Sequence, residues 1–276
     1  MNLSEALKLI SRLPQNPRGF YDELSVRFEL WREHKAHISP SYQPMEWEEI
    51  ILGLEKYLQT DLRKILAEPA LAEIEEKVQI GIKKLSDEAV PFPLIHNGDP
   101  LLGRLCYTIC RAVKPEIFVE TGVAYGVTSA FLLQALKVNG GGKLYSIDRA
   151  PAQPNAEKFV GTLIPADLRD NWHLYRGRSL KILPGLLSKL KKIDIFMHDS
   201  RHTYKNMSSE FQLVAPYLAE KSILMSDDVN RNVAFQEWIE YSKPDFCATA
   251  AENTKESLFG VSLFTNKHFR TKVQKC

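Results

Sequence analysis

The fold of this chain is decided by one stretch, Ile117-Phe118-Val119-Glu120-Thr121-Gly122-Val123-Ala124-Tyr125-Gly126-Val127-Thr128-Ser129. It predicts a short apolar strand, a tight glycine turn and the start of a helix. A helix N-terminus presents unpaired backbone N–H groups, and glycine lets a ligand approach the backbone closely. Glu120 precedes the turn, and its charge would repel a pyrophosphate but suit a cationic amino group. The stretch is therefore typical of a cradle for a small molecule rather than of a phosphate loop.

From residue 101 onward, predicted strands alternate with predicted helices. Strands are expected at residues 116–120, 143–148, 172–176, 193–197, 221–225, 246–250 and 260–265. Helices are expected at residues 101–113, 129–138, 156–168, 180–190, 203–218 and 233–241. The alternation predicts a Rossmann-like, doubly wound, mostly parallel seven-stranded sheet with helices on both faces.

Residues 1–95 precede this pattern and predict a helical N-terminal extension to a main domain of residues 96–276. The helical period is clearest in residues 45–85, and proline and glycine between residues 86 and 100 predict a linker. The extension is expected to pack on the main domain or on a partner chain. Its aromatic side chains are expected to be core residues: Phe20, Tyr21, Phe28, Trp31, Trp47 and Tyr57.

The composition is that of an ordinary globular protein, with 44% hydrophobic and 25% charged residues. The net charge of +2 and the lack of a basic cluster with interleaved aromatics argue against nucleic acid as a partner. A secretory signal and an apolar run of the roughly 20 residues that span a bilayer are both missing. A cytoplasmic protein without a membrane partner is therefore expected. The four cysteines lack CxxC spacing and are expected to be reduced thiols.

Polar residues collect where the predicted strands end, which is the edge at which parallel sheets bind ligands. These positions are Glu120, Asp148, residues 177–179, residues 199–202 and residues 227–228. Asp148 lies 22 residues beyond Gly126, where an acid can accept both ribose hydroxyls of an adenosine. A solvated turn acid is the simpler alternative, and a lone Gly-x-x-x-Gly turn is a weak signal. The pattern Gly-x-Gly-x-x-Gly is absent, which argues against NAD or FAD.

Four segments carry a resemblance to a known family: residues 120–129, Ser146-Ile147-Asp148, residues 175–179 (Tyr-Arg-Gly-Arg-Ser) and Met197-His198-Asp199. Together they resemble class I S-adenosylmethionine-dependent methyltransferases, above all the small-molecule O-methyltransferases that include catechol, macrocin and aminocoumarin enzymes. The resemblance covers about residues 95–265 and implies S-adenosylmethionine as cofactor. It implies these cofactor-binding residues: Glu120, Thr121, Gly122, Tyr125, Gly126, Thr128, Ser129, Asp148, Arg149, Arg178, Ser179 and Asp199.

Within that set, the resemblance implies that Glu120 and Gly122 hold the methionine end of the cofactor and that Asp148 holds the ribose. Arg178 and Ser179 would then lie beside the adenine.

Three acids, Asp199, Asp227 and Asp228, follow two adjacent strands and can form an oxygen site for Mg²⁺. Neighbouring carboxylates repel each other unless a cation or a hydrogen-bond donor neutralises them. In metal-dependent members of the family, acids at these positions hold the ion, and the match is residue for residue. The alternative is that Asp227 caps the following helix and Asp228 is solvated.

The loop after the fourth strand reads Asp199-Ser200-Arg201-His202-Thr203-Tyr204, where many relatives read Asp-Gly-Asp-His-Ser-Tyr. The second acid of that pattern serves as general base in some relatives, and here it is Arg201. His202 is therefore the candidate catalytic base. An imidazole has a pKa near 6.5 and can take the proton of a hydroxyl group near neutral pH. The alternatives are a histidine that only orients the loop, and an Arg201 that pairs with an acceptor carboxylate or with Asp199.

The resemblance implies methyl transfer from S-adenosylmethionine to oxygen of a small hydroxylated metabolite, sugar or natural product, assisted by Mg²⁺. Two alternatives stay open: a metal-independent N- or O-methyltransferase, and a non-catalytic cofactor-binding subunit that offers its N-terminal helices to a partner. A nucleotide-sugar or NAD enzyme is disfavoured by the glycine pattern and by Glu120. The expected partner is a small-molecule methyl acceptor, and the apolar extension is also compatible with a homodimer.

Overall fold

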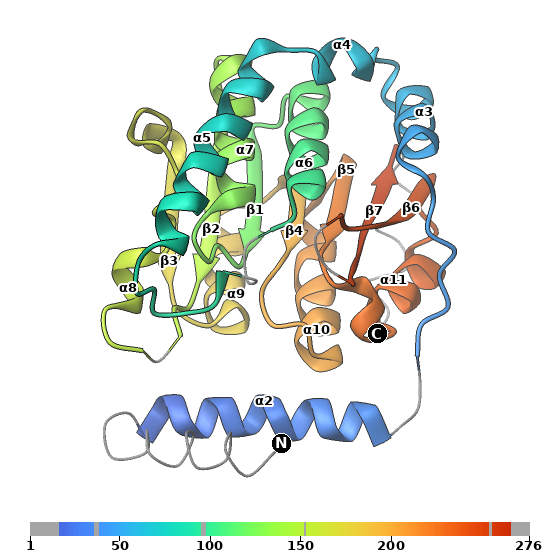
Figure 1. The fold of residues 1–276 in the computed structure, drawn as a ribbon. Coiled ribbons are helices and arrows are strands. Elements are labelled where there is room, and N and C mark those ends of the chain that lie inside the picture. The colour runs from blue at the N-terminus through green and yellow to red at the C-terminus, as the bar shows by residue number, and fades with distance from the viewer. Residues whose placement is uncertain (1–16, 36–38, 95–97, 152, 254–255, 266–276) are drawn as a thin grey trace.

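The computed structural model describes residues 17–35, 39–94, 98–151, 153–253 and 256–265. Its centre is a seven-stranded sheet with strand order β3-β2-β1-β4-β5-β7-β6 (Figure 1). The strands are β1 (Ile117–Thr121), β2 (Lys143–Asp148), β3 (Trp172–Arg176), β4 (Ile193–His198), β5 (Leu218–Ser226), β6 (Phe246–Ala251) and β7 (Leu258–Phe264). Strands β1 to β5 are parallel, and β7 is antiparallel to its neighbours β5 and β6. The predicted Rossmann-like sheet is confirmed.

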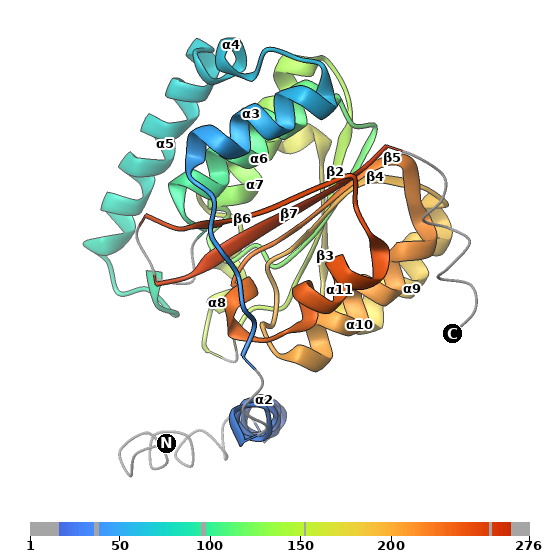
Figure 2. The same ribbon diagram turned by 90° about the vertical axis from the view of Figure 1, so that its right-hand side faces the viewer.

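Helices cover both faces of the sheet (Figure 2). One layer holds α3 (Trp47–Leu58), α4 (Leu62–Leu66), α5 (Pro69–Ser86), α6 (Pro100–Val113), α7 (Val127–Asn139) and α8 (Ala156–Phe159). The other layer holds α9 (Ser179–Leu190), α10 (Tyr204–Val214) and α11 (Ala234–Ser242). Successive strand residues point to opposite faces, so in β1 Phe118 joins the core under the first layer and Val119 joins the core under the second.

Two predicted helices are longer than the observed ones. The helix predicted over residues 156–168 is wrong, because α8 ends at Phe159 and only a 3₁₀ helix, Ala166–Asn171, follows. Gly161 interrupts it with a φ of +73° in the left-handed region, where it packs against the ring of Trp172. The helix predicted over residues 203–218 ends at Val214, ahead of Pro216, which leads the chain into β5.

The helices α3 to α5 pack into the same core as the sheet. Ile50, Leu54 and Ile74 are fully buried there together with residues of α6 and α7. The segment before α3 is also tied to the sheet, because the backbone N–H of Met45 donates to the carbonyl of Thr249 in β6 at 2.7 Å. These helices therefore behave as part of the main fold, while the predicted domain limit near residue 95 stays a prediction.

Helix α2 (Pro17–Lys35) lies apart from both layers, across the edge where the parallel strands end (Figures 1 and 2). The prediction that its aromatic side chains are core residues is wrong for Tyr21, Phe28 and Trp31, which are 64%, 57% and 52% exposed. Phe20 of α2, and Trp47 and Tyr57 of α3, are half-buried. The error arises because the apolar spacing of α2 predicts a buried face but cannot tell which surface, if any, covers it.

Every helix in the described ranges is too short or too polar to cross a bilayer.

Cys106 and Cys110 are free thiols on the buried side of α6, as their four-residue spacing predicts, and burial raises the pKa of both.

The packing of α3 yields a stability prediction. Ile50→Ala removes a fully buried side chain and should lower the free energy of unfolding by about 2–5 kcal/mol. The control is Leu52→Ala on the same helix, where the side chain is 54% exposed and the change should stay within about 0.5 kcal/mol. Urea unfolding followed by circular dichroism measures both. Equal losses in the two variants would show that α3 does not belong to the core.

Candidate active site

The turn after β1 lies directly against the end of β4. Gly122 has a φ of +89°, and a Cβ atom on it would lie 1.8 Å from the carbonyl oxygen of Asp199. The backbone N–H of Asp199 donates to the carbonyl of Thr121 at 2.7 Å. Only glycine fits this position, because any side chain would separate the two strand ends. The predicted cofactor turn and the predicted metal ligand Asp199 are therefore neighbours.

Asp148, at the end of β2, holds the same turn from the other side. Its Oδ2 atom accepts hydrogen bonds from the backbone N–H groups of Val123, at 2.8 Å, and Ala124, at 3.2 Å. Burial raises the pKa of Asp148, and these two hydrogen bonds oppose the rise by favouring the ionised carboxylate. The structure shows a buried acid that shapes the turn, instead of the solvated turn acid that was the alternative from the sequence, and the ribose-binding role stays a prediction.

Glu120 is buried on the face of the sheet that α7 covers. Its Oε1 atom accepts hydrogen bonds from the hydroxyl groups of Ser129 and Ser146, both at 2.5 Å. Ser146 in turn accepts from the indole N–H of Trp172 at 2.7 Å. Burial raises the pKa of Glu120 to about 7, although both hydroxyl donors oppose the rise.

Thr121 points to the opposite face of β1, where its hydroxyl donates to Oε2 of Glu210 at 2.6 Å. Glu210 is fully buried on α10, and its Oε2 also lies 2.7 Å from Nδ1 of His198 at the end of β4. Its Oε1 accepts from Ser200 at 2.7 Å and from Asn206 at 2.9 Å. One carboxylate therefore joins the ends of β1 and β4 to the loop that follows β4.

Burial alone would raise the pKa of Glu210, but the charge of His198 and hydrogen bonds from His198, Ser179 and Thr121 lower it. The sequence interpretation missed this residue and gave His198 no role. A signal was present, because Glu210 interrupts the apolar stripe of Met207, Phe211 and Val214, which are all buried on α10. A charged residue within a buried stripe indicates buried partners.

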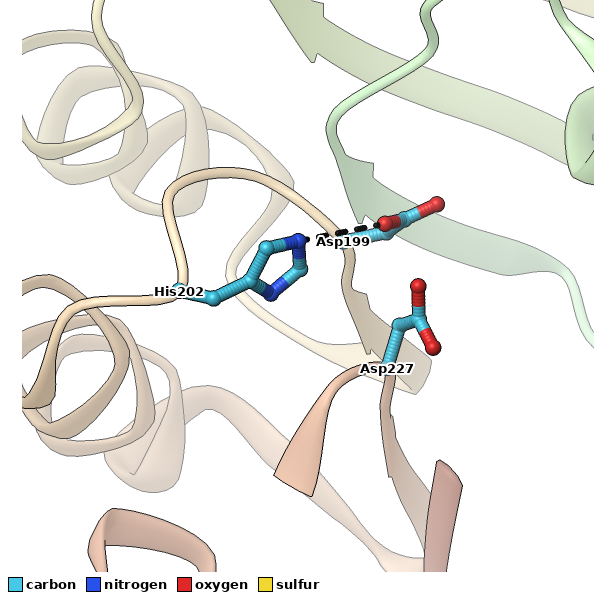
Figure 3. A group of neighbouring side chains, drawn as sticks. All are labelled: Asp199, His202 and Asp227. Atoms are coloured by element: carbon cyan, nitrogen blue, oxygen red, sulfur yellow. Dashed lines mark ion pairs between the residues drawn. The ribbon is translucent and has the colours of Figure 1, made fainter. Parts of the chain in front are cut away.

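The acids predicted to bind metal meet His202 at the ends of β4 and β5. Asp199, His202 and Asp227 each offer one potential ligand atom, and these atoms all lie within 4.8 Å of one another (Figure 3). Nε2 of His202 lies 3.7 Å from Oδ1 of Asp199 and 3.5 Å from Oδ2 of Asp228. His202, the predicted base, thus lies in direct contact range of the acids that are predicted to bind the metal.

Asp227 and Asp228 differ in their surroundings. Asp227 is buried, and its Oδ1 accepts from the backbone N–H of Asp228 at 2.8 Å, but it does not cap the following 3₁₀ helix, which begins after Asp228 and has no side-chain cap. Asp228 has a φ of +53°, pairs with Arg231 at 3.1 Å and accepts a hydrogen bond from Ser257. Burial would raise the pKa of Asp228, but His202, Ser257 and Arg231 together lower it. Asp228 therefore already has a cationic partner in the protein.

The remaining predicted cofactor residues divide into buried and exposed positions. Tyr125 is fully buried, stacks on Phe92 and donates its hydroxyl to the Phe92 carbonyl at 2.6 Å. Three others are also buried near the turn or near Glu210: Gly126, Thr128 and Ser179. By contrast, Arg149 and Arg178 are exposed beyond the ends of β2 and β3. Direct ligand contact is thus geometrically simpler for the exposed arginines.

Arg201, the residue that departs from the family pattern, lies within the electrostatic influence of α2. Burial lowers its pKa, the charge of Glu29 on α2 opposes this, and Arg178 and Arg149 add to the lowering. Glu29 also accepts a hydrogen bond from the hydroxyl of Thr203, the residue that caps α10, at 3.2 Å. These contacts place α2 over the loop between β4 and α10, so the extension borders the candidate site.

Comparison with known proteins agrees with this geometry. Residues 119–229 match the family model described as a methyltransferase domain. No curated protein matches the chain by sequence. Among solved structures, the O-methyltransferase from Bacillus cereus in complex with S-adenosylhomocysteine is 14% identical, with a TM-score of 0.54 over 78% of this chain and 97% of that chain.

A second similar structure is the O-methyltransferase TomG from Streptomyces achromogenes, involved in tomaymycin synthesis and bound to S-adenosylmethionine. It is 15% identical, with a TM-score of 0.53 over 80% of this chain and 100% of that chain. At such identities the likeness concerns the fold. The family match covers residues 119–229, and together with the shared fold it agrees with the resemblance of the motifs to class I methyltransferases.

The buried Glu120 predicts a pH-dependent stability. Below about pH 4.5 the carboxyl is protonated in the folded and unfolded states alike, so it contributes no difference. Between about pH 4.5 and 7 the unfolded chain releases the proton while the folded chain retains it, so stability falls as pH rises and then levels off. The advantage of Glu120→Gln over the wild type should therefore grow by about 3 kcal/mol across this range.

Urea unfolding at pH values from 4.5 to 8 measures this difference. Glu116→Gln is the matched control, because Glu116 is exposed one residue before β1. Its unfolding free energy should run parallel to that of the wild type at all pH values. A parallel curve for Glu120→Gln as well would mean that Glu120 is ionised in the folded protein at low pH.

Proposed function

We propose that this protein transfers the methyl group of S-adenosylmethionine to a hydroxyl oxygen of a small acceptor, such as a metabolite, sugar or natural product. The observation that carries the proposal is the contact between Gly122 and the backbone of Asp199. It brings the turn that would hold the methyl donor next to the acidic group that would hold the acceptor oxygen. The cofactor-bound states of the two similar O-methyltransferases support the same assignment.

The cofactor would lie along the edge formed by β1, β2 and β3. The proposal rests on residues that reach this edge: Gly122 through its backbone, Asp148 through the carboxylate oxygen that does not hold the turn, and the exposed Arg149 and Arg178. The bound cofactor supplies the reactive methyl on its sulfonium, so the protein has to bind, orient and exclude water. Orientation of the two reactants can lower the barrier by several kcal/mol, up to about 7–11 in ideal cases.

The acceptor hydroxyl must lose its proton, and His202 is the group proposed to take it. Its imidazole is a quarter exposed, and Asp199 and Asp228 within 3.7 Å favour the protonated form that results. Beside it, the carboxylates of Asp199 and Asp227 would hold a divalent cation, which would lower the pKa of the acceptor hydroxyl. Mg²⁺ is the cation predicted from the sequence, with Asp228 as the further oxygen ligand.

A second candidate function is a cofactor-binding subunit without its own turnover, which docks a partner through α2. The observation that favours it is the exposure of Tyr21, Phe28, Leu30 and Trp31 on that helix. A second copy of this chain is one such partner. This function predicts cofactor binding without methyl transfer to any acceptor in a broad panel, and an assembly larger than a monomer in light scattering.

Cofactor binding tests the first half of the proposal. Titration calorimetry should detect binding of S-adenosylhomocysteine, and Asp148→Asn should weaken it by about tenfold or more, because a hydrogen bond to a charged group is lost. The control is Asp170→Asn, an exposed acid in the 3₁₀ helix before β3, which should bind as the wild type does. The absence of any binding by the folded wild-type protein would overturn the proposed function.

Transfer itself tests the second half. Radiolabelled S-adenosylmethionine with a panel of hydroxylated acceptors should yield methyl ethers, and a chelator should lower the rate. Asp227→Asn should lower it by about 10- to 100-fold, the loss typical when the surroundings of a metal site are altered. Unchanged turnover in the chelator would show that the enzyme does not need a metal ion. An N-methylated product would show that the acceptor atom is nitrogen instead of oxygen.

A further inference from the structure

The side chain of His202 is oriented toward the acids rather than toward open solvent. Its ring packs at right angles against the buried ring of His198, with centroids 5.5 Å apart. His198 is itself fixed by Glu210 at 2.7 Å, and the carbonyl of His202 accepts a hydrogen bond from Asn232 at 3.2 Å. The backbone and the ring are both held, so Nε2 is preorganised beside Asp199 and Asp228. Figure 3 shows the ring of His202 directed toward Asp199 and Asp227.

The spacing of these atoms suits a shared cation. Donor atoms that bind one cation at about 2.1 Å lie about 3 Å apart in octahedral geometry and somewhat further apart in tetrahedral geometry. The 3.7 Å between His202 and Asp199 exceeds this only slightly, and all three ligand atoms of Asp199, His202 and Asp227 lie within 4.8 Å of one another. A small closing movement of side chains would bring them to bonding distance.

The charges select two of the three acids. Asp228 has Arg231 at 3.1 Å and a hydrogen bond from Ser257, so a cationic partner already neutralises it. Asp199 and Asp227 together carry two negative charges when ionised, which a divalent cation balances, and their ligand atoms lie within 4.8 Å of that of His202. The set that the structure assembles is therefore two carboxylates and one imidazole, instead of the three carboxylates predicted from the sequence.

We propose that His202 is a metal ligand through Nε2, and that the site prefers a first-row transition metal such as Mn²⁺, Co²⁺ or Zn²⁺ to Mg²⁺. Mg²⁺ favours oxygen ligands and gives up its waters reluctantly, whereas imidazole nitrogen is a favoured ligand of the transition metals. The inference rests on the proposed function for the use of the metal, since the cation would hold the acceptor oxygen. It changes the role proposed there for His202 as the base, because an imidazole nitrogen bound to a metal can no longer accept the proton of the acceptor hydroxyl.

The test is metal binding by the full chain without cofactor or acceptor. Titration calorimetry with MnCl₂, CoCl₂, ZnCl₂ and MgCl₂ should show binding of the transition metals at least about tenfold tighter than binding of Mg²⁺. His202→Ala should weaken Mn²⁺ binding by about 10- to 100-fold and leave Mg²⁺ binding nearly unchanged. The control is His173→Ala, which removes a histidine that stacks on Tyr145 in the sheet, and it should keep the wild-type affinities.

Pulsed electron paramagnetic resonance of the Mn²⁺-loaded wild type gives a readout that does not depend on how the variants fold. A ¹⁴N coupling from a bound imidazole is expected, and it should disappear in His202→Ala. Equal affinity for Mn²⁺ and Mg²⁺, no ¹⁴N coupling, or no metal binding at all would each overturn the inference and leave His202 as an ion-pair partner of the acids. Failure of the proposed function is a separate result, since it is detected by S-adenosylhomocysteine binding without metal.

Discussion

The arrangement of the site depends on one buried charge, the carboxylate of Glu210. A carboxylate removed from water costs several kcal/mol unless hydrogen bonds and a counter-charge replace the lost hydration. Here these come from Thr121 at the end of β1, His198 at the end of β4 and Ser200 in the following loop. The hydrogen bonds to the Glu210 carboxylate therefore fix the relative positions of the strand ends and of the loop that carries Asp199 and His202.

A second buried carboxylate, Glu120, lies on the other face of the same strand and behaves in the opposite way. Both residues receive hydrogen bonds from hydroxyl groups, but only Glu210 has a histidine beside it. Burial raises the pKa of both carboxyls, but at Glu210 the charge of His198 and the hydrogen bonds from His198, Ser179 and Thr121 together lower it. The alternation of side chains along β1 thus places Glu120 under α7, on the opposite face of the sheet from the Glu210 network under α10.

The sequence predicted what depends on local pattern. The strand limits of β2 and β3, the glycine turn and the acids at the strand ends follow from apolar periodicity and from turn residues. It did not predict the roles of Glu210 and Tyr125, or the exposure of Phe28 and Trp31. Those properties depend on contacts between residues far apart in the chain, such as Tyr125 with Phe92 and Thr203 with Glu29. A helical pattern reveals an apolar face, but the surface that meets it is set by the whole fold.

The loop from Asp199 to His202 shows how the replacement of an acid by Arg201 is accommodated. Ser200 turns inward to Glu210, while Asp199 and His202 turn toward Asp227 and Asp228. Arg201 lies among the charges of Glu29, Arg178 and Arg149. The arginine that departs from the family pattern therefore places a positive charge near Glu29 of α2, at the edge of the site.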